Sequence, residues 1–87
     1  MNTFPLVISS PHGDVWSGDA FMITLRGAVG NLAVLAGHIP LVTSLVPCEI
    51  KIELPDEEVL CGTVQEGVLV VTAEKTTVLT GTFAWKK

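Results

Sequence analysis

The most regular pattern of hydrophobic and polar positions lies at residues 48–54. In this segment, CEIKIEL, apolar side chains alternate with charged ones at every second position. A period of two is typical of a β-strand with one buried and one solvent-exposed face. Pro55 and Asp56 follow as turn-forming residues, and residues 58–64 resume with β-branched and apolar types. These two segments are therefore predicted to form a β-hairpin, in which Gly62 indicates a bulge.

Short β-rich segments recur along the rest of the chain. Residues 67–71 and 75–80 are separated by a loop short enough for a second hairpin. Near the N-terminus, residues 3–9 and 19–25 flank a shorter piece at 14–17. No apolar pattern of helical spacing runs for ten or so positions without Gly, Pro or a β-branched residue. The pattern therefore predicts strands and no helix.

The fold class predicted by these segments is all-β, a small antiparallel β-sandwich or flattened barrel. With 87 residues, of which 48% are hydrophobic, the chain can hold one hydrophobic core. It contains no internal repeat, low-complexity segment or linker. Residues 1–87 are therefore expected to form a single domain.

Charge and composition narrow the classes of partner. The net charge is −4, and no basic run is present beyond Lys86-Lys87. The sequence therefore lacks the clustered positive charge that is typical of a nucleic-acid-binding protein. Charged residues make up only 16% of the chain, compared with roughly 25% in typical soluble domains. Part of the apolar surface is therefore expected to contact another protein.

Neither a membrane span nor a secretion signal is predicted. Polar residues interrupt the longest apolar stretch, 30–46, before it reaches the ~18 residues that a spanning helix needs. The N-terminal segment has no basic region and becomes polar too early for a signal peptide. These features favour a cytoplasmic location.

The two cysteines, Cys48 and Cys61, lack the spacing of a metal or redox site and are interpreted as reduced structural thiols. A hairpin turning at Pro55-Asp56 would pair Cys48 with Thr63. The two sulfurs would then share one face diagonally, with backbone positions ~7–8 Å apart, too far for an unstrained disulfide. A register shifted by two residues would place them opposite each other.

Catalytic chemistry finds little support in the sequence. The only two histidines, His12 and His38, lack the spacing of a zinc site. The polar residues of 9–14 resemble parts of a hydrolytic triad, but neighbours along an extended chain alternate faces and cannot converge. The acidic run at 56–58 is interpreted as a solvated turn. Phosphate-binding glycine motifs are absent, so no catalytic, cofactor-binding or metal-binding residue is assigned, and no cofactor is expected.

Three motifs in order, which span most of the chain, carry a resemblance to a known family. They are SPHGDVWSGDAFMITLRG at 10–27, GNLAVLAGHIPLVT at 30–43 and VQEGVLVVTAEKTTVLTGT at 64–82. The chain resembles the N-terminal β-sandwich domain of the epsilon subunit of the F-type ATP synthase, which is called delta in mitochondria. The G-H-x-P-L-V-T block, residues 37–43, is the most specific of the matches. Departures include Ala36 where the family usually has proline and Asn31 where an acidic residue is frequent.

The resemblance implies a non-catalytic subunit of the central stalk of a rotary, proton-translocating ATP synthase. Such a subunit binds the gamma subunit and the polar loops of the membrane c-ring, and couples ring rotation to gamma during ATP synthesis. The location implied is peripheral, at the cytoplasmic face of the bacterial cell membrane. Many members continue into a C-terminal pair of helices that inhibits ATP hydrolysis or senses ATP. Because these 87 residues do not include that helical hairpin, neither role is expected of them.

The resemblance also implies two contact sites. The gamma-subunit contact is expected at an apolar patch with a polar rim, made of His38, Leu41, Val42, Thr43, Val78, Leu79, Thr80 and Gly81. The c-ring contact is expected at the loop made of Arg26, Gly27, Ala28, Val29, Gly30 and Asn31. In this interpretation His38 lies near the gamma contact and takes no part in catalysis.

Two other classes of protein compete with this interpretation. One is an unrelated β-sandwich module that binds a protein or a carbohydrate. Such a module usually displays exposed aromatic side chains, whereas most of the five aromatic residues here are better placed in a core. The other is a small hydrolase, which would have to bring a nucleophile and a base together from distant strands.

Overall fold

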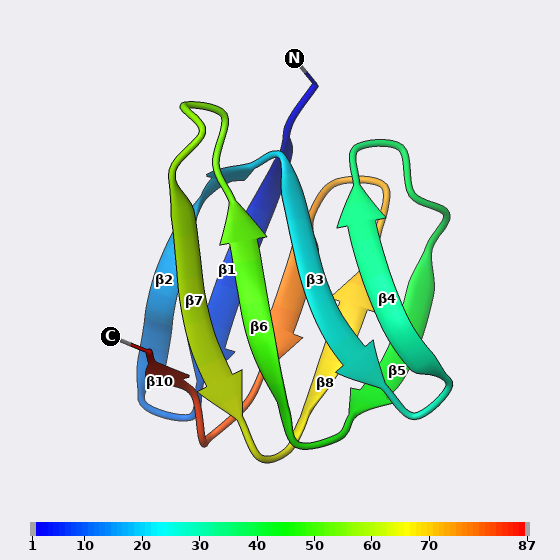
Figure 1. Ribbon diagram of the computed structural model, residues 1–87. Coiled ribbons are helices and arrows are strands. Elements are labelled where there is room, and N and C mark those ends of the chain that lie inside the picture. Colours follow the sequence, from blue (N-terminus) through cyan, green and yellow to red (C-terminus); the bar gives the residue numbers. More distant parts are fainter. Residues whose placement is uncertain (1, 87) are drawn as a thin grey trace.

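The computed structural model describes residues 2–86 and contains, in that range, ten β-strands and no helix (Figure 1). The prediction of an all-β fold is confirmed. The strands are β1 (Phe4–Ser10), β2 (Gly13–Ala20), β3 (Met22–Gly27), β4 (Gly30–Leu35), β5 (Leu41–Leu45), β6 (Cys48–Glu53), β7 (Val59–Val64), β8 (Gly67–Val71), β9 (Thr76–Leu79) and β10 (Ala84–Trp85).

The strands form one strongly curled sheet whose two halves face each other as layers (Figure 1). One layer has the order β10-β7-β6-β3-β4 and the other β5-β8-β9-β1-β2. A single paired position, Gly27 with Leu45, joins β3 to β5 and so connects the layers. All strand pairs are antiparallel except β1 with β9, which run parallel. Among residues 2–86, strand pairing joins the two layers only between β3 and β5, so the sandwich is not a closed barrel.

The core lies between the two layers and follows the period of two. Ile50 and Ile52 of β6 are fully buried, whereas Glu49 and Lys51 between them are exposed. Burying an aliphatic side chain of this size contributes about 1.5–3 kcal/mol to folding. The alternation predicted for β6 is confirmed. The other large side chains that are fully buried are Leu6, Ile8, Ile23, Leu69, Val34, Val64 and Val78.

Two expectations about strand boundaries were wrong. The short piece predicted at 14–17 is the middle of an eight-residue strand, β2. The predicted strand 19–25 is divided, because β2 ends at Ala20 and β3 begins at Met22. Phe21 lies between them, and its N–H donates to the carbonyl oxygen of Glu53 over 2.8 Å. The chain passes from one layer to the other at this residue, and an unbroken run of β-forming types gives no signal for such a step.

The β6–β7 hairpin forms as predicted, but with a different loop and register. The N–H of Leu54 donates to the carbonyl oxygen of Glu58, and Glu57 has a positive φ of 71°. The loop is thus longer than a turn at Pro55-Asp56 alone. Cys48 pairs with Val64, one residue beyond the expected partner.

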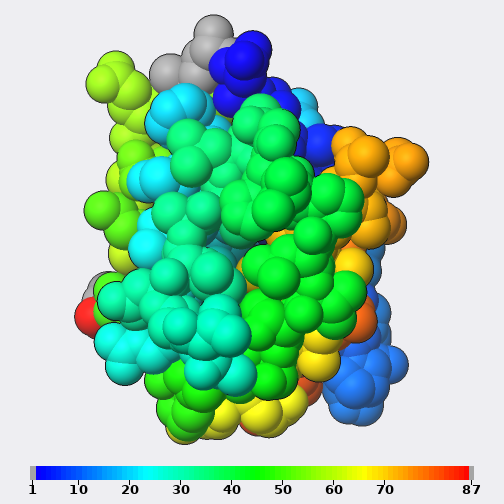
Figure 2. All heavy atoms as spheres, turned by 90° about the vertical axis from the view of Figure 1, so that its right-hand side faces the viewer, coloured from blue at the N-terminus to red at the C-terminus, as the bar shows by residue number. Residues whose placement is uncertain are grey.

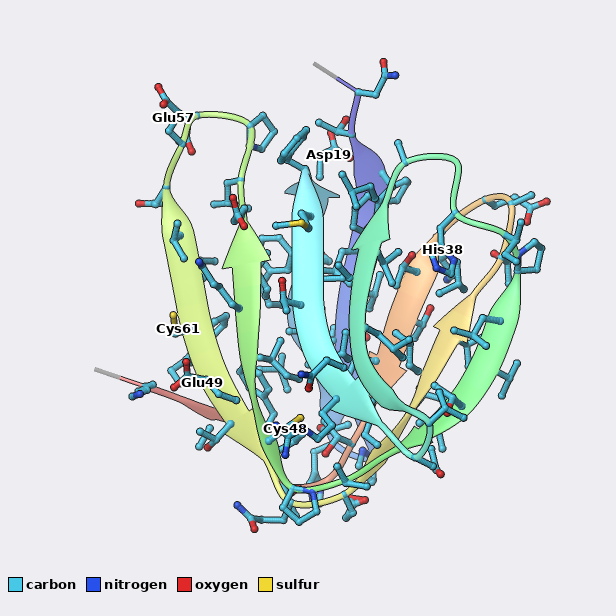
Figure 3. The ribbon with its side chains drawn as sticks, turned by 45° about the vertical axis from the view of Figure 1, so that its right-hand side comes forward. Asp19, His38, Cys48, Glu49, Glu57 and Cys61 are labelled. Atoms are coloured by element: carbon cyan, nitrogen blue, oxygen red, sulfur yellow. The ribbon has the colours of Figure 1, made fainter. Side chains whose placement is uncertain are left out.

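This shift corrects the predicted placement of the two cysteines. Ile50 pairs with Gly62 on the inner face, whereas Lys51 pairs with Cys61 on the outer face. Cys48 packs against the core, so the two thiols lie on opposite faces of the layer and are free (Figure 3). They do not share a face diagonally, because a slip of one residue moves every side chain to the other face.

Gly62 is not a bulge, because it pairs in regular register with Ile50. A Cβ atom at this position would lie 2.3 Å from Cζ of Phe83. Glycine is therefore required so that the Phe83 ring can lie directly on β7. The ring also contacts Trp85 edge-to-face, with centroids 4.8 Å apart.

The last strand, β10, was not predicted, and it is held to β7 and β6. Ala84 and Trp85 pair with Thr63 and Gly62. Lys86 forms an ion pair with Glu49, and the hydrogen bond and negative charge of Glu49 raise the pKa of the lysine above its usual value. Because this pair is exposed, its contribution to stability is small.

Candidate functional site

The residues tested for catalysis do not converge. Among residues 2–86, no three His, Cys, Asp or Glu side chains are grouped so that they could hold a metal ion. The hydroxyl of Ser10 accepts from the N–H of His12 over 3.2 Å and donates to the carbonyl oxygen of Gly13 over 3.0 Å. Residues 10–13 therefore form the polar turn between β1 and β2. In the described part of the chain, the structure also contains no helix of the length and hydrophobicity that a membrane crossing requires.

The outer face of β5, β8, β9 and β1 is apolar and carries no charge. Val42, Val70, Thr77 and Val7 lie side by side in one row across these four strands. The next row is formed by Ser44, Val68, Leu79 and Ser9. We call the surface formed by Val7, Val42, Val68, Val70, Thr77 and Leu79 the apolar face.

Within the apolar face, the most exposed side chains are Val42 and Leu79, with 69% and 46% of their surface accessible. Val68 is also exposed, and its strand, β8, lies between the strand of Val42, β5, and the strand of Leu79, β9. Exposed apolar side chains gathered on one uncharged face are typical of a protein interface. The apolar face is therefore the first candidate for a contact surface.

The structure separates the eight residues that sequence analysis grouped as the gamma-subunit contact. Val42 and Leu79 lie on the apolar face. Leu41 and Thr43, which alternate with Val42, point inward and are half-buried. Val78 is fully buried and Thr80 is 5% exposed. These two side chains support β9 from within and do not reach the surface.

His38 and Gly81 lie near opposite ends of the molecule. His38 is in the connection from β4 to β5, at the end of the sandwich where Leu41 pairs with Val71 (Figure 3). Gly81 follows β9 at the other end, where its N–H donates to Oε1 of Glu66 over 3.0 Å. A contact that includes both of them must therefore extend over the whole length of the apolar face.

The imidazole of His38 is oriented by the loop in which it lies. Its Nδ1–H donates to the carbonyl oxygen of Ile39 over 2.7 Å, and its backbone N–H donates to Leu35 over 3.2 Å. His38 lines a hollow of about 340 Å³ together with Phe4, Val71 and residues 72–76. Its backbone contacts are those expected of a loop residue.

The six residues expected to contact the c-ring lie together at the end of the β3–β4 hairpin. Gly27 pairs with Gly30, so Ala28 and Val29 form a two-residue turn. Gly30 has a φ of +121°, a conformation that favours glycine. Val29 is 79% exposed at the tip.

The same hairpin end is attached to the rest of the molecule by backbone hydrogen bonds. The N–H of Ala28 donates to the carbonyl oxygen of Ser44 over 2.9 Å, and that of Val46 donates to Arg26 over 3.3 Å. Figure 2 shows this hairpin beside β5 on the flank between the two layers. The tip is thus a short projection from a rigid body.

Sequence analysis missed four members of the apolar face, Val7, Val68, Val70 and Thr77. The segment 67–71 was predicted to be a strand, but every residue after its glycine is apolar. Both faces of β8 are therefore equally hydrophobic in the sequence. The sequence of β8 therefore gives no signal for which of its two faces is outside, and the structure places Val68 and Val70 there.

Comparison with known proteins identifies the class to which this fold belongs. The β-sandwich domain of the ATP synthase delta/epsilon chain matches residues 3–86, and the chain belongs to that family. Because the chain belongs to this family, the two alternatives considered above, an unrelated binding module and a small hydrolase, no longer apply.

Related sequences carry the same name. The chain is 34% identical over 76 residues to the ATP synthase epsilon chain of Persephonella marina, covering 87% of this chain and 56% of the relative. It is 37% identical over 84 residues to that of a Psychrobacter species, covering 94% and 59%. The chain thus spans somewhat more than half the length of these relatives.

Solved structures share the fold at low sequence identity. A chain of the Euglena gracilis mitochondrial ATP synthase, in an assembly of OSCP, F1 and c-ring, superposes with a TM-score of 0.88 at 20% identity, covering 95% of this chain and 53% of its own. A chain from the central stalk and c-ring of the Tetrahymena thermophila enzyme gives 0.77 at 16%, covering 95% and 66%. These likenesses confirm the β-sandwich.

Proposed function

We propose that this chain is the β-sandwich part of an ATP synthase epsilon subunit, which joins the gamma subunit to the c-ring and transmits rotation without catalysing a reaction. The proposal rests on family membership and on the names of its relatives and structural neighbours, which include central-stalk and c-ring assemblies. The structural observation that carries it is the apolar face, since a stalk subunit needs a permanent protein interface.

The gamma subunit contacts the apolar face in this proposal, with Leu79 near the centre and Val42 on the edge strand β5. Both side chains are exposed, and the strand between them adds Val68 and Val70. Burying such a surface yields free energy without the cost of removing charges from water. His38 and Gly81, at the two ends, are proposed as rim residues of the same contact.

The buried members of the expected patch stabilise this interface from behind. Val78 alternates with Leu79 along β9 and anchors the strand in the core. The hydroxyl of Thr80 donates to the carbonyl oxygen of Glu66 over 2.6 Å, which ties the end of β9 to the β7–β8 turn. The interface side chains are therefore presented by a stiff sheet, as transmission of torque requires.

The c-ring contacts the end of the β3–β4 hairpin in this proposal. Gly27 lies beside Leu45, and Leu45 pairs with Gly67 at the start of β8, so the hairpin end lies at one end of the apolar face. A partner on the face and a partner at the end can therefore bind at the same time. The corresponding location is peripheral, on the cytoplasmic side of a bacterial membrane.

Co-purification with the gamma subunit of the same organism tests the proposal. The unsubstituted chain should form a stoichiometric complex, and its melting temperature should rise because gamma binds only the folded state. Val42→Asp should abolish the complex, because a carboxylate would be buried in an apolar contact without a partner.

Val59→Asp is the matched control. Val59 is 45% exposed on β7, in the other layer, so this variant introduces the same charge away from the apolar face. It should retain the complex. If Val42→Asp binds gamma as well as Val59→Asp does, the apolar face is not the gamma contact.

A further inference from the structure

Arg26 is the only charged residue between Ala20 and Cys48. It lies at the end of the β3–β4 hairpin, next to the exposed turn Ala28-Val29. The chain as a whole has a net charge of −4. The hairpin end is therefore a local positive site on an acidic molecule.

The guanidinium of Arg26 is oriented but not neutralised. Its Nε–H donates to Oδ1 of Asn31 over 2.9 Å, and Asn31 is its direct cross-strand neighbour. This bond leaves the two terminal nitrogens of the guanidinium to donate elsewhere. Because Asn31 is neutral, it restricts the side chain without removing its charge.

No carboxylate in the described part of the chain pairs with Arg26. Within residues 2–86, the single ion pair joins Lys86 and Glu49. Glu49, labelled in Figure 3, lines the same shallow hollow as Arg26 and Asn31, but its carboxylate is already bound to Lys86. An exposed, oriented arginine of this kind is well suited to bind a carboxylate of another molecule.

We propose that the hairpin end binds an acidic loop, in which an aspartate or glutamate accepts hydrogen bonds from Arg26 and an apolar side chain contacts Val29. This inference rests on the proposed c-ring contact and adds its chemistry, namely that the ring loop facing this chain carries a carboxylate. A basic ring loop would be repelled by Arg26, so charge at this contact also selects the partner.

Binding of the chain, in complex with gamma, to the c-ring of the same organism in lipid nanodiscs tests the inference. Arg26→Gln should weaken binding about tenfold and reduce its dependence on salt, and Arg26→Glu should weaken it further. Lys75→Glu is the matched control, since Lys75 lies in the loop after β8, at the other end of that strand. It should bind as the unsubstituted chain does.

Zero-length crosslinking identifies the carboxylate directly. Arg26→Lys keeps the positive charge and introduces an amine that carbodiimide can join to a nearby carboxylate as an amide. Mass spectrometry of the crosslinked complex should find residue 26 joined to an aspartate or glutamate of a ring loop. A crosslink from residue 26 to gamma alone would contradict the inference.

The outcomes distinguish this inference from the proposed function beneath it. If the unsubstituted chain binds gamma but not the c-ring, the ring contact itself is wrong, and the inference fails with it. If ring binding occurs but is the same for Arg26→Gln, Arg26→Glu and the control, the ring contact stands and only its acidic partner is refuted.

Discussion

At the scale of single residues, glycine and arginine carry the most specific information in this chain. Gly62 makes room for the Phe83 ring, which would otherwise lie 2.3 Å from a Cβ atom. Arg26 provides the charge of the hairpin end. In both cases the role depends on a residue distant in the sequence or on a partner, and for this reason the residue type alone indicated a bulge at Gly62.

Gly62→Ala is expected to lower the free energy of unfolding by about 1–3 kcal/mol, because Phe83 must move off β7 to admit the methyl group. Urea denaturation measures the effect. Gly81→Ala is the control, since the nearest atom to a Cβ there is 3.8 Å away. Replacing Phe83 by leucine in the same chain should recover part of the loss. Equal stability of the two glycine variants would contradict the packing described here.

At the scale of elements, register decides which face of a strand a side chain occupies. The alternation of 48–54 predicted the strand correctly. The loop that follows differs from the predicted turn at Pro55-Asp56, and the pairing of the two strands is shifted by one residue. As a result Cys48 and Cys61, predicted to share a face, lie on opposite faces. The element was therefore predictable, while its pairing depended on a five-residue loop whose conformation includes a positive φ at Glu57.

The observed register predicts a new disulfide at the position opposite Cys61. Lys51 is its direct cross-strand partner on the outer face, and directly opposed residues lie at backbone distances of about 4.5–5.5 Å, which a disulfide can span. The double variant Lys51→Cys, Cys48→Ser should form an intrachain disulfide under mild oxidation. Thiol titration and mass spectrometry measure it.

The unsubstituted chain is the comparison for this experiment. Its two native thiols should stay unpaired within the chain under the same oxidation, because they lie on opposite faces of the layer. Formation of a bond between Cys48 and Cys61 in the folded protein, with none in the double variant, would contradict the observed register, because it requires the two cysteines to lie opposite each other on one face.

At the scale of the whole molecule, two surfaces of different chemistry lie on one rigid body. The apolar face runs across β5, β8, β9 and β1, and the charged hairpin end projects at one end of it. In the function proposed above, gamma binds the apolar face and the c-ring binds the hairpin end. Paired strands and a common core would couple these two proposed contacts mechanically.

The isolated chain is expected to self-associate through the apolar face when gamma is absent, because exposed apolar surface without charge favours contact between copies. Sedimentation velocity over a range of concentrations measures this. Val42→Asp should shift the population to monomer, and Val59→Asp should not. A monomer at every concentration for the unsubstituted chain would show that the face is too small or too well hydrated to associate by itself.

Much of the fold and part of the site were predictable from sequence. The hairpins at 48–64 and 67–80 and the all-β class followed from periodicity and turn residues, because these signals are local. The residues expected at the c-ring contact, 26–31, lie together at one hairpin end, and their contact with the ring stays a prediction. Of the residues expected to contact gamma, Val42 and Leu79 are exposed whereas Val78 and Thr80 are buried, and the contact itself also stays a prediction.

The sequence by itself determined most of the strand segments, the absence of recognisable catalytic motifs and the family, since each depends on residue types at short spacing. Tertiary structure decided the register of β7, the layer to which each strand belongs and the face of β8 that meets solvent. The physical reason is that alternation along a strand assigns its side chains to two faces but does not indicate which face is buried. That choice is made by loop length and by the opposite layer, whose residues are distant in the chain.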